Sequence, residues 1–160
     1  TRLSAETTMS PAARLSQMTE EDLPHAIALD EASFGARRDR LLHAIFRDSP
    51  NRSACYVVDG PNRFAGFVMA KVTGQTAEVG PLVCPPEAEQ KAEELAEAAL
   101  TSLGGRRVYM GVSQRSLGLY RRLRAIGFQE DFRVLRMWLG GESPKAGEAS
   151  YRLMESLERG

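Results

Sequence analysis

Apolar residues recur at two different spacings along the chain, and each spacing predicts one kind of element. In the first third they lie three and four positions apart, which predicts one helix ending near Ser33-Phe34-Gly35 and another over Arg38–Arg47. The sequence Asp48-Ser49-Pro50-Asn51 is predicted to end the second helix. Runs of β-branched and aromatic residues follow, which is typical of strands. These strands are predicted over Ala54–Val58, Phe64–Val72 and Ala77–Val83.

The start of this region is predicted to contain a short strand and a capped helix. The strand covers Leu15–Met18. Thr19 follows as the helix N-cap, because Asp22 stands at the third helical position, where a capping box places an acid. The apolar side chains that we expect the helix to bury are Leu23, Ile27 and Ala28.

Prolines and glycines divide the second half of the chain. Pro85-Pro86 ends the strand before it and is predicted to open a long helix, because proline suits the first helical turn. Gly104-Gly105 ends that helix, as a C-terminal glycine does. The elements predicted after it are a strand over Arg107–Val112, a helix over Leu117–Ile126 and a final strand over Phe132–Leu139.

The predicted element order is therefore β-α-α-β-β-β-α-β-α-β. Three strands in a meander followed by a helical crossover indicate an α/β (α+β) fold, with a mixed, mostly antiparallel central sheet and helices on both faces. Residues 1–13 are small and polar and are predicted to form a flexible N-terminal arm, while residues 14–160 form a single domain. Tyr151–Leu157 follows a glycine-rich loop, and we expect this tail to dock back on the domain.

The charge balance and the rare residue types argue against several classes of function. The 160 residues hold 21 Lys and Arg against 21 Asp and Glu, so the net charge of zero gives no general attraction to nucleic acid or anionic membranes. No run of about 18 apolar residues is present, which argues against a membrane span. Cys55 and Cys84 are too few for a disulfide scaffold, and the two histidines fit no metal-ligand spacing. These features predict a cytoplasmic protein with no metal site and with neither nucleic acid nor membrane as partner.

Three segments carry a resemblance to a known family. They are Asp30–Arg38 followed by Leu41-Leu42, Val79–Cys84 leading into the long helix, and Gly127-Phe128 followed by Arg136-Met137. Together with the element order, they resemble the GNAT superfamily of N-acetyltransferases, in particular the C-terminal domain of two-domain (tandem) GNAT proteins. The resemblance implies transfer of an acetyl group from acetyl-CoA, as co-substrate, to an amine.

The same resemblance implies where acetyl-CoA lies. Its pantetheine arm would enter a gap between the strands Ala77–Val83 and Arg107–Val112, where backbone groups near Leu82 and Val83 would pair with it. The start of the long helix would hold the pyrophosphate, because free N–H groups and the helix dipole favour an anion there. The chain departs from the family at this point, since residues 85–94 contain no glycine and four glutamates. The other positions assigned to the cofactor are Gln90, Lys91, Ala92, and Ser116 in place of the family's asparagine.

Catalytic groups are predicted on three different elements. Leu123 replaces the tyrosine that often serves as the acid in the family, so Tyr120, about one helical turn earlier, is the candidate acid. The alternative is that Tyr120 packs its ring and keeps its hydroxyl in solvent. Glu31 stands in the helix that often lines the acceptor site and is the candidate base, directly or through water. Cys84 ends a central strand and is a further candidate, with a small buried core residue as its alternative.

Other charged residues have structural interpretations. Asp30 is predicted to pair with Arg37 or Arg38. A group of arginines near the last strand-helix unit would either hold an anion such as the adenosine 3′-phosphate or form a solvated helix face. Its members are Arg106, Arg107, Arg115, Arg121, Arg122 and Arg124.

After the sequence has been considered, two functions stand ahead of a third, an anion-binding module that uses the arginine group. The first is an acyl-CoA-dependent N-acetyltransferase that acts on a small amine or an amino terminus, with direct attack of a neutral amine on the thioester. The second is a GNAT-fold domain without catalysis that serves as a structural, ligand-binding or dimerisation module, pairing with another domain or with itself. The expected strand gap favours the first function, and the missing glycines and tyrosine favour the second.

Overall fold

The structure is a computed structural model that describes residues 15–60, 64–134 and 150–154. Their strands are β1 (Leu15–Gln17), β2 (Tyr56–Val58), β3 (Gly66–Thr73), β4 (Thr76–Val83), β5 (Arg107–Val112) and β6 (Tyr151–Met154). Their helices are α1 (Leu23–Phe34), α2 (Asp39–Arg47), α3 (Ser49–Arg52), α4 (Glu89–Ser102) and α5 (Leu117–Ala125). The order of elements matches the prediction apart from the four-residue helix α3.

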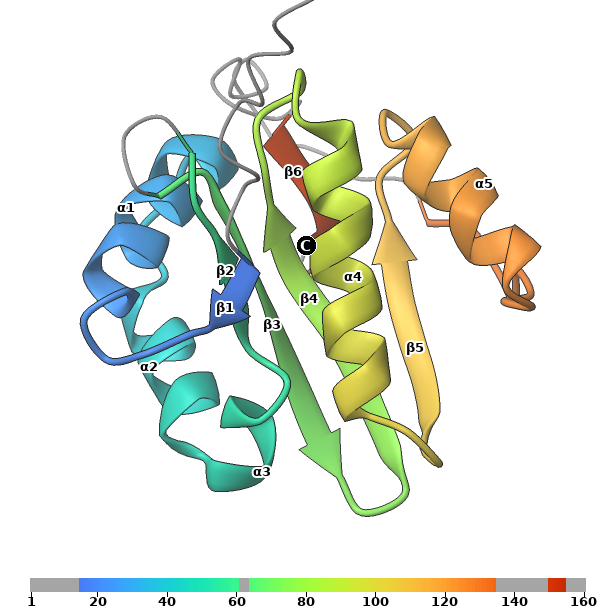
Figure 1. Ribbon diagram of the computed structural model, residues 1–160, viewed down its shortest axis with the longest axis horizontal. Coiled ribbons are helices and arrows are strands. Elements are labelled where there is room, and N and C mark those ends of the chain that lie inside the picture. Colours follow the sequence, from blue (N-terminus) through green and yellow to red (C-terminus); the bar gives the residue numbers. More distant parts are fainter. Residues whose placement is uncertain (1–14, 61–63, 135–149, 155–160) are drawn as a thin grey trace, which may run out of the picture.

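The strands form one mixed sheet, which Figure 1 shows face-on. The pairs β1–β2, β2–β3 and β3–β4 are antiparallel. β4 and β5 are parallel, because α4 carries the chain back along the sheet between them. β6 runs antiparallel to both β4 and β5. The predicted α/β fold with a mixed, mostly antiparallel sheet is confirmed.

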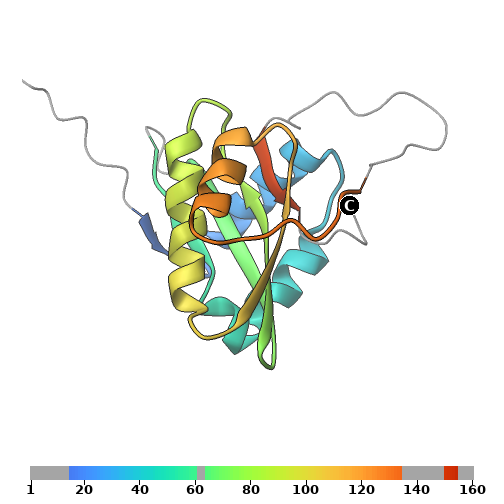
Figure 2. The same cartoon turned by 90° about the vertical axis from the view of Figure 1, so that its right-hand side faces the viewer.

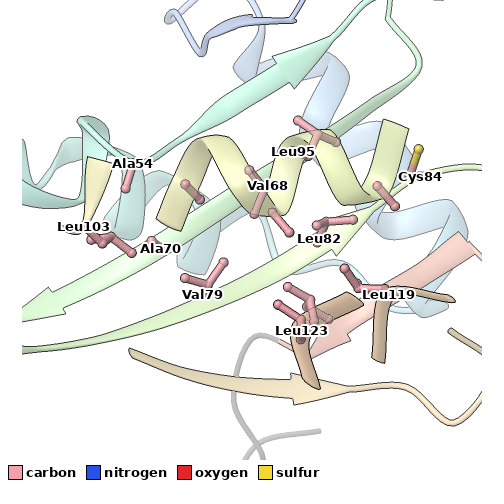
Figure 3. Close-up of a cluster of buried hydrophobic side chains, with 14 of the residues drawn as sticks. Ala54, Val68, Ala70, Val79, Leu82, Cys84, Leu95, Leu103, Leu119 and Leu123 are labelled. Atoms are coloured by element: carbon pink, nitrogen blue, oxygen red, sulfur yellow. The ribbon is translucent and has the colours of Figure 1, made fainter. Parts of the chain in front are cut away.

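Different helices cover the two faces of the sheet (Figures 1 and 2). Successive residues of a strand point to opposite faces, so β3 supplies Phe67 and Met69 to one core and Val68 and Ala70 to the other. The first core lies under α1 and α2, and the second lies under α4 and α5. Figure 3 shows the second core, in which Leu95 of α4, Leu103 directly after α4, and Leu119 and Leu123 of α5 pack against the sheet.

The start of α1 differs from the predicted cap. The N–H and the hydroxyl of Thr19 both donate to the carboxylate of Asp22 at 2.8 Å, but the helix begins only at Leu23. The Thr–Asp pair therefore closes a turn ahead of the helix instead of capping it. The expected burial of Ala28 is wrong, because Ala28 is exposed and Ala26 is the buried alanine.

Two further helix boundaries are set by the surrounding structure. α3 lies where the sequence predicts only the end of α2, and Asn51 holds it in place by donating to the carbonyl of Ile45 at 3.1 Å and accepting from the N–H of Val72 at 2.6 Å. The prediction that Pro85-Pro86 opens the long helix is wrong. Both prolines lie in the loop before α4, which begins at Glu89.

The last strand is not the one that the sequence predicts. Residues 132–134 carry no strand, and the rest of the predicted strand Phe132–Leu139 lies outside the described residues, as do Arg136-Met137 and the predicted arm 1–13. The final strand of the described sheet is instead β6, within the predicted tail Tyr151–Leu157. Four residues are too few to show an alternating pattern above chance, so the segment had no clear signal in the sequence.

Candidate functional site

β4 and β5 separate halfway along their length, and a bulge in β4 explains why. Two residues of β4, Gly80 and Pro81, stand opposite the single residue Met69 of β3. A bulge bends its strand, and proline has no N–H to donate to a neighbouring strand. The parallel pairing of β4 with β5 ends just before this bulge, at Val79 and Met110. We call the space between the diverging ends of β4 and β5 the strand gap.

β6 occupies the strand gap. Leu153 of β6 pairs with Leu82 of β4 on one side and with Val112 of β5 on the other. The carbonyl of Arg152 accepts from the N–H of Ser113 at 3.0 Å. The tail that was expected to dock back on the domain therefore does so as a strand of its sheet, as the red strand beside β4 in Figure 1 shows.

The β4 edge that faces the gap already has protein partners. The N–H of Cys84 donates to the carbonyl of Ser150 at 2.9 Å. Because backbone groups of successive strand residues turn to opposite edges, Leu82 faces β6 like Cys84, and Val83 faces β3. Leu82 and Val83 are both fully buried. In this conformation, a ligand that pairs with this edge of β4 must first separate it from β6.

Arg152 fastens β6 to the loop between β4 and α4. The register shifts by one residue between Leu82 and Val83, so Arg152 is the extra residue of a bulge in β6. Its guanidinium donates to the carbonyls of Pro85 at 3.0 Å and Pro86 at 2.9 Å. Arg152 is only 4% exposed. Sequence reasoning missed this residue, although a charged residue inside the run Tyr-Arg-Leu-Met was an available signal.

A carboxylate of the chain itself lies at the N-terminus of α5. Glu89, the first residue of α4, accepts from the N–H of Gly118 at 3.0 Å. A Cβ at position 118 would lie 2.1 Å from that carboxylate oxygen, so the close approach depends on glycine. Ser116 is the N-cap of α5, and its buried hydroxyl has no hydrogen-bond partner among the described residues. The Glu89 charge suits the helix dipole of α5 and opposes a second anion there.

The other residues predicted to hold the cofactor take part in contacts along α4. Gln90 is exposed and donates to Glu94 one turn later at 3.2 Å. Lys91 donates to the carbonyl of Asp59 at 3.1 Å, which ties α4 to the end of β2. Ala92 is fully buried in the core beneath α4. Of these three, Gln90 is the residue most easily released to meet a ligand, because an exposed hydrogen bond exchanges readily with solvent.

Tyr120 lines a cavity beside β5 and α5. The cavity has a volume of about 610 Å³, and residues 128–134 form its outer wall. The Tyr120 hydroxyl donates to the carboxylate of Glu130 at 2.8 Å, and Arg133 donates to the same carboxylate at 2.6 Å. Hydrogen bonding from Arg133, and then from Tyr120, lowers the pKa of Glu130 to about 2. No sequence pattern points to Glu130, because it lies in a segment without helix or strand.

Cys84 and Glu31 lie on other elements. Within the described residues, neither lines the cavity that holds Tyr120. Burial raises the pKa of the Cys84 thiol to about 11, and the thiol donates to the carbonyl of Ala88 at 3.4 Å. A thiol with this pKa is protonated at neutral pH and accepts no proton, which supports the alternative that Cys84 is a buried core residue. Glu31 is exposed on α1.

The predicted pair between Asp30 and an arginine is confirmed, with Arg38 as the partner. Arg38 donates from Nη2 to Oδ1 of Asp30 at 2.6 Å and from Nε to Oδ2 at 3.0 Å. The same guanidinium donates to the hydroxyl of Tyr151 and lies 3.8 Å above the centre of the Phe34 ring. Burial alone would lower the pKa of Arg38, but hydrogen bonding to Asp30 and the nearby Tyr151 outweigh it and raise that pKa. The cluster joins the corner between α1 and α2 to β6.

The arginines grouped near β5 and α5 are exposed. Arg122 pairs with Glu97 at 2.7 Å, and Arg124 donates to the carbonyl of Phe128 at 3.0 Å. These contacts fit the solvated helix face that the sequence allows, because exposed ion pairs of this kind contribute little to binding or stability.

No helix in residues 15–60, 64–134 and 150–154 is both long enough and apolar enough to pass through a membrane. The same ranges contain no group of three His, Cys, Asp or Glu side chains placed to hold a metal ion. Cys55 and Cys84 are both buried and free.

Several solved structures share this fold. A ribosomal-protein-S18-alanine N-acetyltransferase from Escherichia coli matches with 15% identity and a TM-score of 0.60, over 75% of this chain and 79% of that one. The wild-type protein TTHA1254 from Thermus thermophilus matches with 23% identity and a TM-score of 0.54, over 81% and 99% of the two chains. AAC(6')-Iy, solved with a CoA-containing bisubstrate analogue, matches with 17% identity and a TM-score of 0.55, over 81% and 99%. A comparison with curated proteins finds no match.

At these identities the structural likeness establishes the fold, and a family model adds the relationship. The model of the acetyltransferase (GNAT) domain matches residues 26–151. That span includes the bulge of β4, the strand gap and the helix after it, and it reaches the first residue of β6. The chain therefore belongs to the GNAT acetyltransferase family.

Proposed function

We propose that the chain is an N-acetyltransferase that moves an acetyl group from acetyl-CoA to the amine of a small molecule or of a protein amino terminus. The observation that carries the proposal is the divergence of the parallel strands β4 and β5 after Val79 and Met110, directly before the long helix α4. In a member of the GNAT family, this gap is the place for the pantetheine arm. Ser116 supports the proposal, because its buried hydroxyl lacks a partner among the described residues and is available to a polar ligand.

The proposed reaction is direct attack of a neutral amine on the thioester. Glu31 is exposed on α1, so its carboxylate is open to a water molecule that would carry the proton away from the amine. Tyr120 is the proposed acid for the leaving thiolate. Its proton is shared with Glu130, so this role requires the bond between them to break. The strand amides of Leu82 and Cys84 would orient the carbonyl once they are released from β6.

A second candidate function is favoured by a specific observation. The β4 edge is paired with β6, and Glu89 opposes an anion at the N-terminus of α5. Leu123, at the place of the family's usual acid, is buried in the core and has no proton to give. These features suit a GNAT-fold domain that works as a structural, ligand-binding or dimerisation module without catalysis.

The proposed setting is the cytoplasm, because two free buried cysteines suit a reducing compartment. Two proteins with similar structures act, by their names, on two kinds of acceptor: the ribosomal-protein-S18-alanine N-acetyltransferase on a protein alanine, and an aminoglycoside acetyltransferase from a soil metagenome on aminoglycosides. Both are amine acceptors, and we extend to this chain only that chemical class.

Calorimetric titration with acetyl-CoA, and with free CoA as control, tests the proposal first. A dissociation constant in the micromolar range supports cofactor binding. Release of the CoA thiol in the presence of an amine, drawn from a panel of polyamines, aminoglycosides and short peptides, then supports the acetyltransferase. Tyr120→Phe then separates the roles of the ring and the hydroxyl. If the hydroxyl is the acid, kcat falls about a hundredfold or more while acetyl-CoA affinity stays the same. No heat with acetyl-CoA from the folded protein favours the second candidate function.

A further inference from the structure

β6 is held on both of its edges. On the β4 side it pairs through Leu82 and through the bond from the Cys84 N–H to Ser150, and on the β5 side through Gly111 and Val112. Its side chains are buried as well, since Tyr151, Arg152 and Leu153 are 3%, 4% and 0% exposed. This strand therefore completes the sheet at the place where β4 and β5 separate.

Two side-chain anchors add to the backbone pairing. Arg152 donates to the carbonyls of the loop that leads into α4, and Tyr151 accepts from Arg38 at the corner of α1 and α2. The first anchor lies on the side of the sheet covered by α4, and the ring of Tyr151 packs in the core beneath α1 and α2. β6 thus connects the loop before the long helix to the helices on the opposite face.

The same β4 edge cannot hold β6 and a second hydrogen-bonding partner at once. Each backbone N–H has one hydrogen to donate, and the N–H of Cys84 is used by Ser150. Leu82 faces the same edge and is paired with Leu153. Pairing of these groups with a pantetheine amide therefore requires β6 to leave this edge of β4.

We propose that β6 is a displaceable strand that closes the strand gap, so that acetyl-CoA and the docked strand compete for the same edge of β4. The inference rests on the proposed function and adds a gate to it. The domain alternates between a closed form, in which Arg152 and Tyr151 hold β6 in the sheet, and an open form, in which the gap accepts the pantetheine arm. Acetyl-CoA selects the open form, and its apparent affinity falls with the fraction of molecules that are open.

The strand is built so that it can be released. It has only four residues, and one of them, Arg152, is a bulge that interrupts the ladder. Its two side-chain anchors are hydrogen bonds, from Arg152 to loop carbonyls and from Arg38 to Tyr151, and neither is a salt bridge. A short, interrupted ladder opens at a smaller free-energy cost than the long pairing of β3 with β4.

A reversible disulfide tests the gate in the closed direction. Val112 and Leu153 face each other in the antiparallel β5–β6 pair, and because Ser113 is bonded to Arg152, they form a pair without direct backbone hydrogen bonds. Cα atoms in such a pair are about 4.5 Å apart, within the range that a disulfide spans. The variant is Val112→Cys with Leu153→Cys, in a Cys84→Ala background that removes the nearest native thiol. The oxidised protein is expected to bind acetyl-CoA at least about a hundredfold more weakly than the same protein reduced with a phosphine, because the disulfide holds nearly every molecule in the closed form.

A single substitution tests the gate in the open direction. Arg152→Met removes the hydrogen bonds to the loop carbonyls and keeps an unbranched side chain of similar length. The open form becomes more populated, and acetyl-CoA binding is expected to tighten about tenfold or more, because the loss of even one charged hydrogen bond corresponds to about that factor. Arg47→Met at the exposed end of α2 is the matched control and leaves the affinity unchanged.

The outcomes separate the gate from the proposed function. The gate is supported if acetyl-CoA binds more weakly to the oxidised than to the reduced protein and more tightly to Arg152→Met than to wild type. It is also supported if acetyl-CoA binding appears only in Arg152→Met. Equal binding by the oxidised and reduced proteins overturns the gate and, with it, the placement of the pantetheine arm in the gap. The acetyl-CoA binding itself still supports an acetyltransferase, with the cofactor bound outside the gap. The gate and the acetyltransferase proposal are both overturned if acetyl-CoA binds to none of three proteins: the wild type, the reduced double-cysteine variant and Arg152→Met. If Arg152→Met fails to fold, the oxidised and reduced forms of the disulfide variant decide the question by themselves.

Discussion

The buried pair between Asp30 and Arg38 gives a sharp prediction about stability. The Asp30 carboxylate is fully buried, and the Arg38 side chain is 11% exposed. The two groups share two hydrogen bonds, at 2.6 and 3.0 Å. The perturbations are Arg38→Met, Asp30→Ala and the double variant, because each removes charge from one side or from both.

The expected size follows from the unequal burial of the two partners. Removal of one partner from a buried ion pair costs about 3–5 kcal/mol, because the remaining charge loses its compensation away from water. Arg38→Met leaves the fully buried carboxylate without its guanidinium, so we expect a loss near the upper end, about 4–5 kcal/mol. Asp30→Ala leaves a guanidinium that still reaches solvent and Tyr151, so about 3 kcal/mol is expected. In the double variant no charge is stranded, and the loss is smaller than the sum by about 2 kcal/mol or more.

Urea unfolding followed by far-ultraviolet circular dichroism measures these losses. Arg37→Met is the matched control, because Arg37 is one residue away, exposed, and paired only with the partly exposed Asp39 among the contacts described. We expect its free energy of unfolding to equal that of wild type within error. The reasoning is refuted if Arg38→Met costs no more than Arg37→Met, or if the two single losses add up to the double loss.

Three further predictions concern backbone space, a buried amide and the cysteines. Gly66→Ala places a Cβ 2.8 Å from a backbone oxygen of β4 and should lower the free energy of unfolding by about 2 kcal/mol or more. Gly74→Ala, at φ +57° in open space, should lower it by only about 1 kcal/mol. Equal losses in thermal unfolding contradict this. Asn51→Ala removes partners from two backbone groups and should cost about 2–4 kcal/mol, and a wild-type urea midpoint speaks against the bridging role. Burial raises the pKa of Cys55 and Cys84 to about 11, so the stability that the two protonated thiols contribute is complete below pH 9 and falls as the pH rises through 11. Neither thiol should react with a disulfide reagent at about pH 8 before the protein unfolds. Rapid labelling of either thiol in the folded protein at that pH contradicts this protection.

The parts of the fold that the sequence predicted correctly are those with a local cause. β5 begins and ends at the predicted residues, because its run of apolar residues lies between two turns. The face of α2 that holds Leu42, Ile45 and Phe46 is buried as its spacing predicts. The partnership of Asp30 with Arg38 was also predictable, because the helix corner brings residues eight apart in sequence to one place.

The candidate site was less predictable, because its residues meet through the sheet and not along the chain. The sequence predicted Leu82 and Ser116 as cofactor positions, but it contained no sign that β6 pairs with the same strand edge. Arg152 and the Pro85 carbonyl are 67 residues apart, and no local pattern specifies which buried carbonyls an arginine will reach. The interaction between Glu89 and Gly118 has the same character, at a separation of 29 residues.

The sequence by itself determined most of the elements and the covering of both faces of the sheet by helices, since hydrophobic spacing acts over a few residues. Only the tertiary structure decided what fills the space between β4 and β5. A four-residue strand gains its stability from the edges it meets, and those edges exist only after the bulge has separated β4 from β5. The competition that we propose for one edge of β4 has the same physical cause, and neither segment shows it alone.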